Sequence, residues 1–127
     1  LANLIKREFA AQAPAQLTPI QGRIIAMLCH RTGAVFQRDI EAELHIRRST
    51  ATGILQLMEK NDLIRRESVA SDARLKSLIP TKKAADLDAQ IGEFLRQTEQ
   101  RLTHGLSDEQ LAQFIQTAEH MYANLDR

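Results

Sequence analysis

The chain has 127 residues, of which 43% are hydrophobic and 26% charged, as expected for one globular domain or one compact two-part subunit. The formal net charge of +1 excludes a uniformly basic or acidic protein, and the longest apolar run, residues 24–29, is far too short to span a bilayer. The single cysteine, Cys29, excludes an intrachain disulfide. Together with the absence of a signal-peptide pattern, this cysteine usage fits a reducing, cytoplasmic location.

Hydrophobic spacing predicts two helices before residue 31. The second has a clear start signal, because Thr18 suits the N-cap, Pro19 suits the first helical position and Gln21 completes a capping box. It is expected to end near His30. The first helix is expected over residues 1–11, with an apolar face formed by Leu1, Leu4, Ile5 and Phe9.

Two short elements are predicted next. Residues 34–36 are expected to form a short strand, and a third helix is expected from Gln37 to Leu44, with Ile40 among its inward positions. A tight junction at residues 45–47 then leads into a fourth helix.

The fourth helix has an unusual outer face. Its inward face follows spacings of three and four and consists of Ala51, Ile54, Leu55 and Met58. The other face carries arginines, small hydroxyls, a glycine and a glutamine, which are residue types that approach and hydrogen-bond phosphates and base edges. Gly53 costs about 1 kcal/mol relative to alanine inside a helix, so something other than helix propensity favours it. The alternative interpretation is an ordinary solvated helix face.

A basic hairpin is predicted directly after this helix. Residues 65–68 and 74–79 are expected to form strands, joined by a turn at residues 70–73. Residues 47–83 contain nine Lys or Arg against four acids, a net of +5, whereas the rest of the chain has eight against twelve, a net of −4. A helix followed at once by a cationic β-ribbon is the plan of a winged helix-turn-helix that binds DNA.

Two further helices are predicted after the hairpin. Thr81 is an N-cap candidate for a helix over residues 82–104, with inner positions Leu87, Ile91, Phe94, Leu95 and Leu102, and Gly105 suits its C-terminal stop. Ser107 and Gln110 form a capping box for the last helix, whose apolar stripe comprises Leu111, Phe114, Ala118, Met121 and Leu125. Such a stripe suits a partner helix, which favours packing between subunits over a monomeric helical bundle.

The chain resembles the MarR (multiple antibiotic resistance regulator) transcription factors. The order and spacing of its motifs carry the resemblance: residues 17–21, 46–55, 58–66, 72–74 and 80–84. The resemblance implies a mainly α fold with a small β-wing, in which a winged helix-turn-helix (residues 17–83) is flanked by N- and C-terminal dimerisation helices (residues 1–16 and 84–127). It also implies a homodimer that binds a pseudo-palindromic operator on double-stranded DNA, more in the manner of a repressor than of an activator.

The resemblance assigns roles to individual residues, and for the DNA-contact candidates the alternative is a side chain that is simply exposed to solvent. The base-facing candidates on the fourth helix are Arg48, Ser49, Thr52, Gly53 and Gln56, and Arg47 and Thr50 are expected to meet phosphate. In the wing, Arg74 is the minor-groove candidate and Lys76 a phosphate contact, as Arg65 and Arg66 also could be. Asp72 either orients Arg74 or closes the turn as a surface ion pair. The dimerisation candidates are Leu4, Ile5, Phe9, Leu111, Phe114, Ala118, Met121 and Leu125.

Two positions depart from the family pattern. Arg47 stands where members often have a hydroxyl N-cap, which weakens the cap by about 1 kcal/mol but adds a cation where DNA phosphates would lie. Asp62 stands where glycine is usual, and a left-handed backbone is expected there. These departures are the only hints of the alternative function, a winged-helix protein-interaction module without specific DNA binding.

The remaining features point to no enzyme and no cofactor. No catalytic constellation or phosphate-binding loop is present, and His30, His45, His104 and His120 lack the spacing of a metal site. Cys29 lies late in the second helix beside the buried positions and is interpreted as a core thiol. Some family members sense oxidants through a cysteine, usually in the first helix, and Cys29 does not match that position. Members of the family often bind small anionic or phenolic ligands between the dimerisation helices and the winged helix, so a small-molecule effector is a candidate partner.

Overall fold

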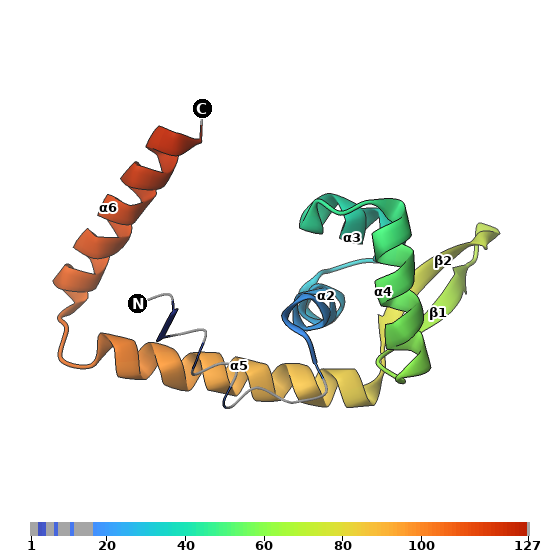
Figure 1. Ribbon diagram of the computed structural model, residues 1–127, viewed down its shortest axis with the longest axis horizontal. Coiled ribbons are helices and arrows are strands. Elements are labelled where there is room, and N and C mark those ends of the chain that lie inside the picture. Colours follow the sequence, from blue (N-terminus) through green and yellow to red (C-terminus); the bar gives the residue numbers. More distant parts are fainter. Residues whose placement is uncertain (1–2, 5–6, 8–10, 12–16, 127) are drawn as a thin grey trace. The chain divides into compact units, whose positions relative to one another are not determined.

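The computed structural model describes residues 3–4, 7, 11 and 17–126 of the chain. It divides into two compact units, residues 1–94 and residues 95–127. The described elements are, in order, α2 (Pro19–His30), α3 (Gln37–Leu44), α4 (Arg48–Lys60), β1 (Ile64–Val69), β2 (Asp72–Pro80), α5 (Lys82–Thr103) and α6 (Asp108–Leu125). This is the predicted mainly helical fold with a two-stranded wing (Figure 1). No helix in the described part of the chain is long and apolar enough to cross a membrane.

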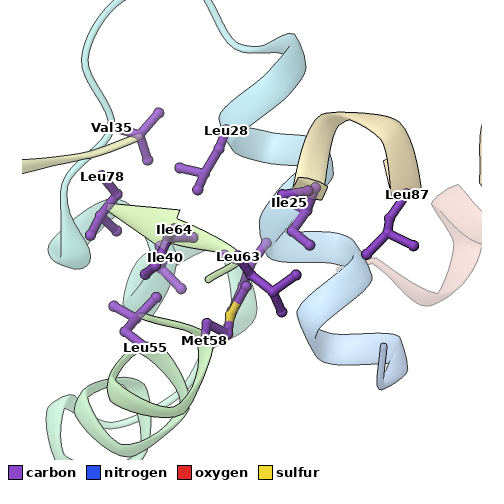
Figure 2. Close-up of a cluster of buried hydrophobic side chains, with 12 residues drawn as sticks. Ile25, Leu28, Val35, Ile40, Leu55, Met58, Leu63, Ile64, Leu78 and Leu87 are labelled. Atoms are coloured by element: carbon purple, nitrogen blue, oxygen red, sulfur yellow. The ribbon is translucent and has the colours of Figure 1, made fainter. Parts of the chain in front are cut away.

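One hydrophobic core holds the first unit together. It draws side chains from α2, α3 and α4, from both strands of the hairpin and from the start of α5 (Figure 2). The largest fully buried side chains are Ile24, Ile25, Ile40, Leu55, Met58, Leu63 and Ile64. Because apolar burial contributes roughly 1.5–3 kcal/mol per large side chain, this cluster fixes α4 and the hairpin on one scaffold. Figure 1 shows α4 lying beside the hairpin, with α3 packed against α4.

The start of α2 is as predicted. Thr18 Oγ1 accepts from Gln21 N–H at 3.2 Å, and Gln21 Oε1 accepts from Thr18 N–H at 3.1 Å, so the capping box is complete. Pro19 occupies the first turn, and the helix ends at His30 as expected. The cap therefore fixes the point at which the chain enters the core.

The hairpin differs from the prediction in two details. The strands pair antiparallel from Ile64 opposite Pro80 to Val69 opposite Asp72, with an irregularity between Ser68 and Val69, so the turn is only residues 70–71 and Asp72 already belongs to β2. Residues 34–36 form no strand, which corrects the expected third strand. One backbone hydrogen bond joins this segment to β2: the Val35 carbonyl accepts from Leu78 N–H at 2.8 Å.

The junction between α4, the hairpin and α5 is held by one buried hydroxyl. Thr81 Oγ1 donates to the carbonyl of Asp62 at 2.7 Å and accepts from Ala84 N–H at 3.1 Å, so it caps α5 as predicted. Asp62 has a φ of 59°, the left-handed backbone expected at the end of α4. Both ends of the wing are thereby tied to the helices on either side of it.

The second unit leaves its apolar residues exposed in the single chain. The helix α6 has a complete Ser107–Gln110 capping box but buries no side chain. Within the predicted stripe, Leu111 is half-buried, whereas Phe114, Ala118, Met121 and Leu125 are exposed. The inner positions predicted for α5 hold for Leu87 and Phe94, which are buried, but Leu95 and Leu102 are exposed. Of the three dimerisation candidates before residue 10, Leu4 is exposed, and Ile5 and Phe9 lie outside the described residues.

Candidate nucleic-acid interface

The buried face of α4 determines which side chains the helix presents. Ala51, Leu55 and Met58 have no exposed surface, so the opposite face of this helix must point outward. Six of the seven predicted contact residues on α4 and its N-cap are exposed, and Thr52 is half-buried; the exposed six are Arg47, Arg48, Ser49, Thr50, Gly53 and Gln56. The residues predicted to contact DNA therefore share one accessible helix face.

The N-terminus of α4 lacks a side-chain cap. Arg47 has the extended backbone of an N-cap residue, with φ −75° and ψ 157°, but its side chain makes no capping hydrogen bond. The amide groups of the first turn and the two arginine side chains therefore all favour an anion at this helix end. The missing cap follows from the departure seen in the sequence.

The helix α3 touches α4 through a residue that sequence reasoning missed. Gln37 Nε2 donates to Thr52 Oγ1 at 2.9 Å and lies 3.4 Å from the carbonyl oxygen of Arg48. Asp39 Oδ2 fixes the start of α3 by accepting from Phe36 N–H at 2.8 Å, and the Arg38 guanidinium lies over the Phe36 ring at 5.1 Å. Only the position of Gln37 at the start of the predicted helix was available in the sequence as a signal.

The wing presents two cations in different ways. The Arg74 side chain is 95% exposed, with its Nε 3.7 Å from Asp72 Oδ1. The same Asp72 oxygen accepts from the backbone N–H of Arg74 at 2.9 Å, so Asp72 contacts Arg74 through both main chain and side chain. Lys76 Nζ donates to Ser68 Oγ on the facing strand at 2.5 Å. The two cations therefore project from the same strand, one extended into solvent and the other held against the wing.

The wing, α3 and α4 enclose a basic hollow of about 350 Å³. Its lining includes one acid, Glu41, and five cations: Arg38, Arg48, Arg66, Arg74 and Lys76. Arg66 already forms an ion pair within the chain, since its Nε lies 3.7 Å from Glu59 Oε1 on α4. The predicted contact residues Arg48, Arg74 and Lys76, together with Arg66, thus meet around this basic hollow. Arg38 joins them, although the sequence analysis did not identify it.

The single cysteine lies apart from this surface. Cys29 packs against the core, and burial, followed by the negative charge of Asp88, raises the pKa of its thiol above the ordinary value. A raised pKa keeps the sulfur in the unreactive thiol form at neutral pH. The chemistry of the described surface is therefore that of cations and hydrogen-bonding groups rather than of a nucleophile.

Comparisons with known proteins agree with this arrangement. Residues 15–75 match the model of the MarR family. The crystal structure of the transcription regulator MarR from Oenococcus oeni PSU-1 is 32% identical with a TM-score of 0.67, over 96% of this chain and 92% of that chain. A comparison with curated proteins finds no match.

Two structures of MepR from S. aureus are also similar. A point mutant of MepR bound to an oligodeoxyribonucleotide is 25% identical with a TM-score of 0.66, over 94% of this chain and 85% of that one. The complex with ethidium bromide is 26% identical with a TM-score of 0.73, over 97% of this chain and 92% of that one. With a winged helix-turn-helix, a basic face and a relative of 32% identity along nearly its whole length, the chain belongs to the MarR family of transcription regulators.

Proposed function

We propose that this regulator is a homodimeric, sequence-specific DNA-binding repressor. The observation that carries the proposal is the shared accessible face of α4 and the wing, where Arg48, Arg74 and Lys76 surround one basic hollow. The N-terminus of α4 would enter the major groove, with Arg48, Ser49, Thr52, Gly53 and Gln56 toward base edges and Arg47 and Thr50 toward phosphate. Arg74 would reach the minor groove, where a narrow groove attracts guanidinium. Asp72, which contacts Arg74 at both its main chain and side chain, would orient it.

The dimer proposal rests on the exposed apolar side chains of the second unit. An 18-residue amphipathic helix with no fully buried side chain needs a covering surface, and Phe114, Met121 and Leu125 are 66%, 63% and 89% exposed. We assign this surface to a second copy of the chain, with residues 1–16 and 84–127 forming the dimerisation region and residues 17–83 the DNA-binding domain. Two recognition helices related by a two-fold axis would then read half-sites about one turn of DNA apart.

Repression would follow from occupancy, since a dimer bound upstream of a gene excludes polymerase from the same DNA. A small anionic or phenolic effector would release the DNA if it bound the two conformations of the dimer with different affinities. The MepR structure that contains ethidium supports ligand binding only for that relative. For the present chain, the effector is the last part of the proposal to test.

The first test is fluorescence-anisotropy binding to the DNA upstream of the protein's own gene, against a shuffled duplex, across a salt series. We expect tight, selective binding whose affinity falls steeply with salt, because phosphate neutralisation releases counterions. If binding is weak and equal for both duplexes, the selection is repeated with a random library of duplexes. A protein that also selects no sequence from the library would instead be a winged helix that serves a protein partner.

The wing assignment is tested by Arg74→Ala. We expect at least about fivefold weaker binding to the selective duplex with the dimer intact, since an arginine that reads DNA contributes roughly 1–3 kcal/mol. Lys82→Ala is the matched control: it also removes one exposed cation, but from the start of α5, where Lys82 Nζ lies 3.9 Å from Asp86. Unchanged affinity in Arg74→Ala would remove the wing from the interface.

A further inference from the structure

The orientation of the Gln37 amide is fixed by its two partners on α4. The carbonyl oxygen of Arg48 is only an acceptor, so the amide atom that faces it must be the NH₂ group, as the 3.4 Å approach of Nε2 shows. That same nitrogen lies 2.9 Å from Thr52 Oγ1. Gln37 therefore donates to Thr52, and the Thr52 hydroxyl is held as the acceptor of this bond.

This bond decides where the Thr52 hydroxyl proton can go. A threonine in a helix commonly donates to the carbonyl four residues earlier, which for Thr52 is that of Arg48. That carbonyl has two lone pairs: the regular α-helical bond to the Thr52 N–H uses one, and Gln37 approaches the other. With its usual acceptor occupied, the half-buried Thr52 hydroxyl is left with its proton for an outside acceptor.

Gln37 is itself held in place. It is the first residue of α3, and the bond between Phe36 N–H and Asp39 Oδ2 fixes the backbone around it. The first turn of α3 packs beside α4 on the common core through Ile40, which has no exposed surface. A bond anchored in this way persists without DNA, so Thr52 would not have to be ordered on binding.

We propose that Gln37 is a positioning residue that fixes Thr52 as a hydrogen-bond donor toward the DNA and thereby sets which bases Thr52 accepts. The inference rests on the proposed function. A donor in the major groove matches guanine N7 or O6, adenine N7 or thymine O4, and it mismatches the amino groups of adenine and cytosine. Gln37 would thus determine specificity at one base pair of each half-site through another residue.

The decisive variant is Gln37→Glu, which has nearly the same shape but a carboxylate that only accepts. The Thr52 hydroxyl must then donate to that carboxylate and present its lone pairs outward, which reverses its preference. A glutamate in the first turn of a helix interacts favourably with the helix dipole, so α3 should remain folded. Gln37→Met, which neither donates nor accepts, releases the hydroxyl without reversing it.

Arg38→Gln is the matched control for charge. It makes the net charge more negative by the same single unit at the next position, and Arg38 contacts Phe36 rather than Thr52. A change in charge weakens binding to all duplexes alike, because the phosphate term does not depend on sequence. The ratio of affinities between duplexes therefore isolates the effect of the hydrogen bond.

The experiment starts with the tightest duplex that the wild-type protein selects from a random library, and measures affinities for all of its single-base-pair variants. We expect Gln37→Glu and Thr52→Val to lose preference at the same base pair, by about three- to tenfold, as for one hydrogen bond. The preference of Gln37→Glu should also shift toward the base pair that offers an amino group at that position. The double variant, Gln37→Glu with Thr52→Val, should lose no more preference than Thr52→Val alone. Gln37→Met should fall between wild type and Gln37→Glu.

Three outcomes would overturn the inference. In the first, Gln37→Glu keeps the wild-type preference while Thr52→Val loses it; in the second, the two variants act at different base pairs; in the third, Thr52→Val changes no preference. In each case the wild-type protein still selects a sequence, so sequence-specific DNA binding stands; the third outcome would also remove Thr52 from the proposed base contacts. A wild-type protein that selects no sequence would overturn both together.

Discussion

His30 and Asp88 show how single residues gain a role that their neighbours in sequence do not suggest. They are 58 positions apart, yet His30 Nε2 and Asp88 Oδ2 lie 2.7 Å apart and join the end of α2 to α5. The sequence analysis found no metal-ligand spacing around His30 and assigned no role to Asp88. The structure leaves the Asp88 side chain only 13% exposed. Its position explains why it also acts on Cys29.

The pKa of Cys29 provides a test at this scale. Burial raises this pKa most, and the charge of Asp88 raises it further because a nearby carboxylate opposes the thiolate. We expect Asp88→Asn to lower the thiol pKa but not to its ordinary value, since burial remains. The rate of alkylation by iodoacetamide as a function of pH gives this pKa as its midpoint.

Asp86→Asn is the control, because it removes an acid from the same helix. The Asp86 carboxylate lies near Lys82 rather than near Cys29 according to its ion pair. An unchanged or higher midpoint in Asp88→Asn would show that the carboxylate does not act on the thiol.

Because the folded-state pKa of the thiol is raised, its protonated form is the one that folding favours. Its contribution to stability should therefore be complete below the unfolded-state pKa and decline as the pH rises toward the folded one.

Among the elements, α4 combines a well-buried face with an N-terminus that has no side-chain cap. Ala51, Leu55 and Met58 are fully buried, which holds the helix by tertiary packing, whereas Arg47 makes no side-chain cap. Where a hydroxyl would satisfy an amide of the first turn, this chain places a cation that suits an anionic partner. Stability and DNA affinity should therefore respond in opposite directions at this position.

We expect Arg47→Ser to raise the free energy of unfolding by about 1 kcal/mol through the restored cap. The same change should weaken DNA binding and reduce the salt slope by about one, as for the loss of one phosphate contact. Urea denaturation and anisotropy titrations in a salt series measure the two effects. Arg48→Ser is the control, since it loses the same charge inside the helix without gaining an N-cap. A stabilised Arg47→Ser variant with unchanged DNA affinity and salt slope would place Arg47 outside the interface.

For the whole molecule, the question is what covers the apolar side chains of the second unit. A stripe of exposed apolar residues on a helix with no fully buried side chain is costly in water, and a second copy of the chain is the partner that we propose for it. Dimerisation would also make the observed stability depend on protein concentration.

We expect Phe114→Glu to convert the dimer to monomer, because a charge cannot be buried at the centre of an apolar interface without a partner. Sedimentation or light scattering at several concentrations measures this change, and selective DNA binding should weaken with it, since one half-site contact is lost. Gln113→Glu is the matched control: it adds the same charge at an exposed neighbouring position. If Phe114→Glu sediments like wild type, α6 does not form the interface.

Features that depend on local chemistry could be predicted from the sequence alone. The capping boxes of α2 and α6, the bounds of α3 and the hairpin after α4 follow from side chains within a few residues of one another, and the structure confirms them. The left-handed Asp62, expected from its place at the end of a helix where the family has glycine, is confirmed as well. The spacing of apolar residues likewise predicted which face of α4 is buried, because helical periodicity is fixed by backbone geometry.

Contacts between elements, in contrast, are set by the tertiary structure. It brings Gln37 to Thr52, His30 to Asp88 and the cations of α3, α4 and the wing to one hollow. It also joins residues 34–36 to the wing through one backbone hydrogen bond, from Leu78 N–H to the Val35 carbonyl, where a strand was expected. These outcomes depend on how helices pack on a shared core, which places residues far apart in sequence within hydrogen-bond reach. No local pattern records such distances, so the side chain that orients Thr52 became visible only in the folded chain.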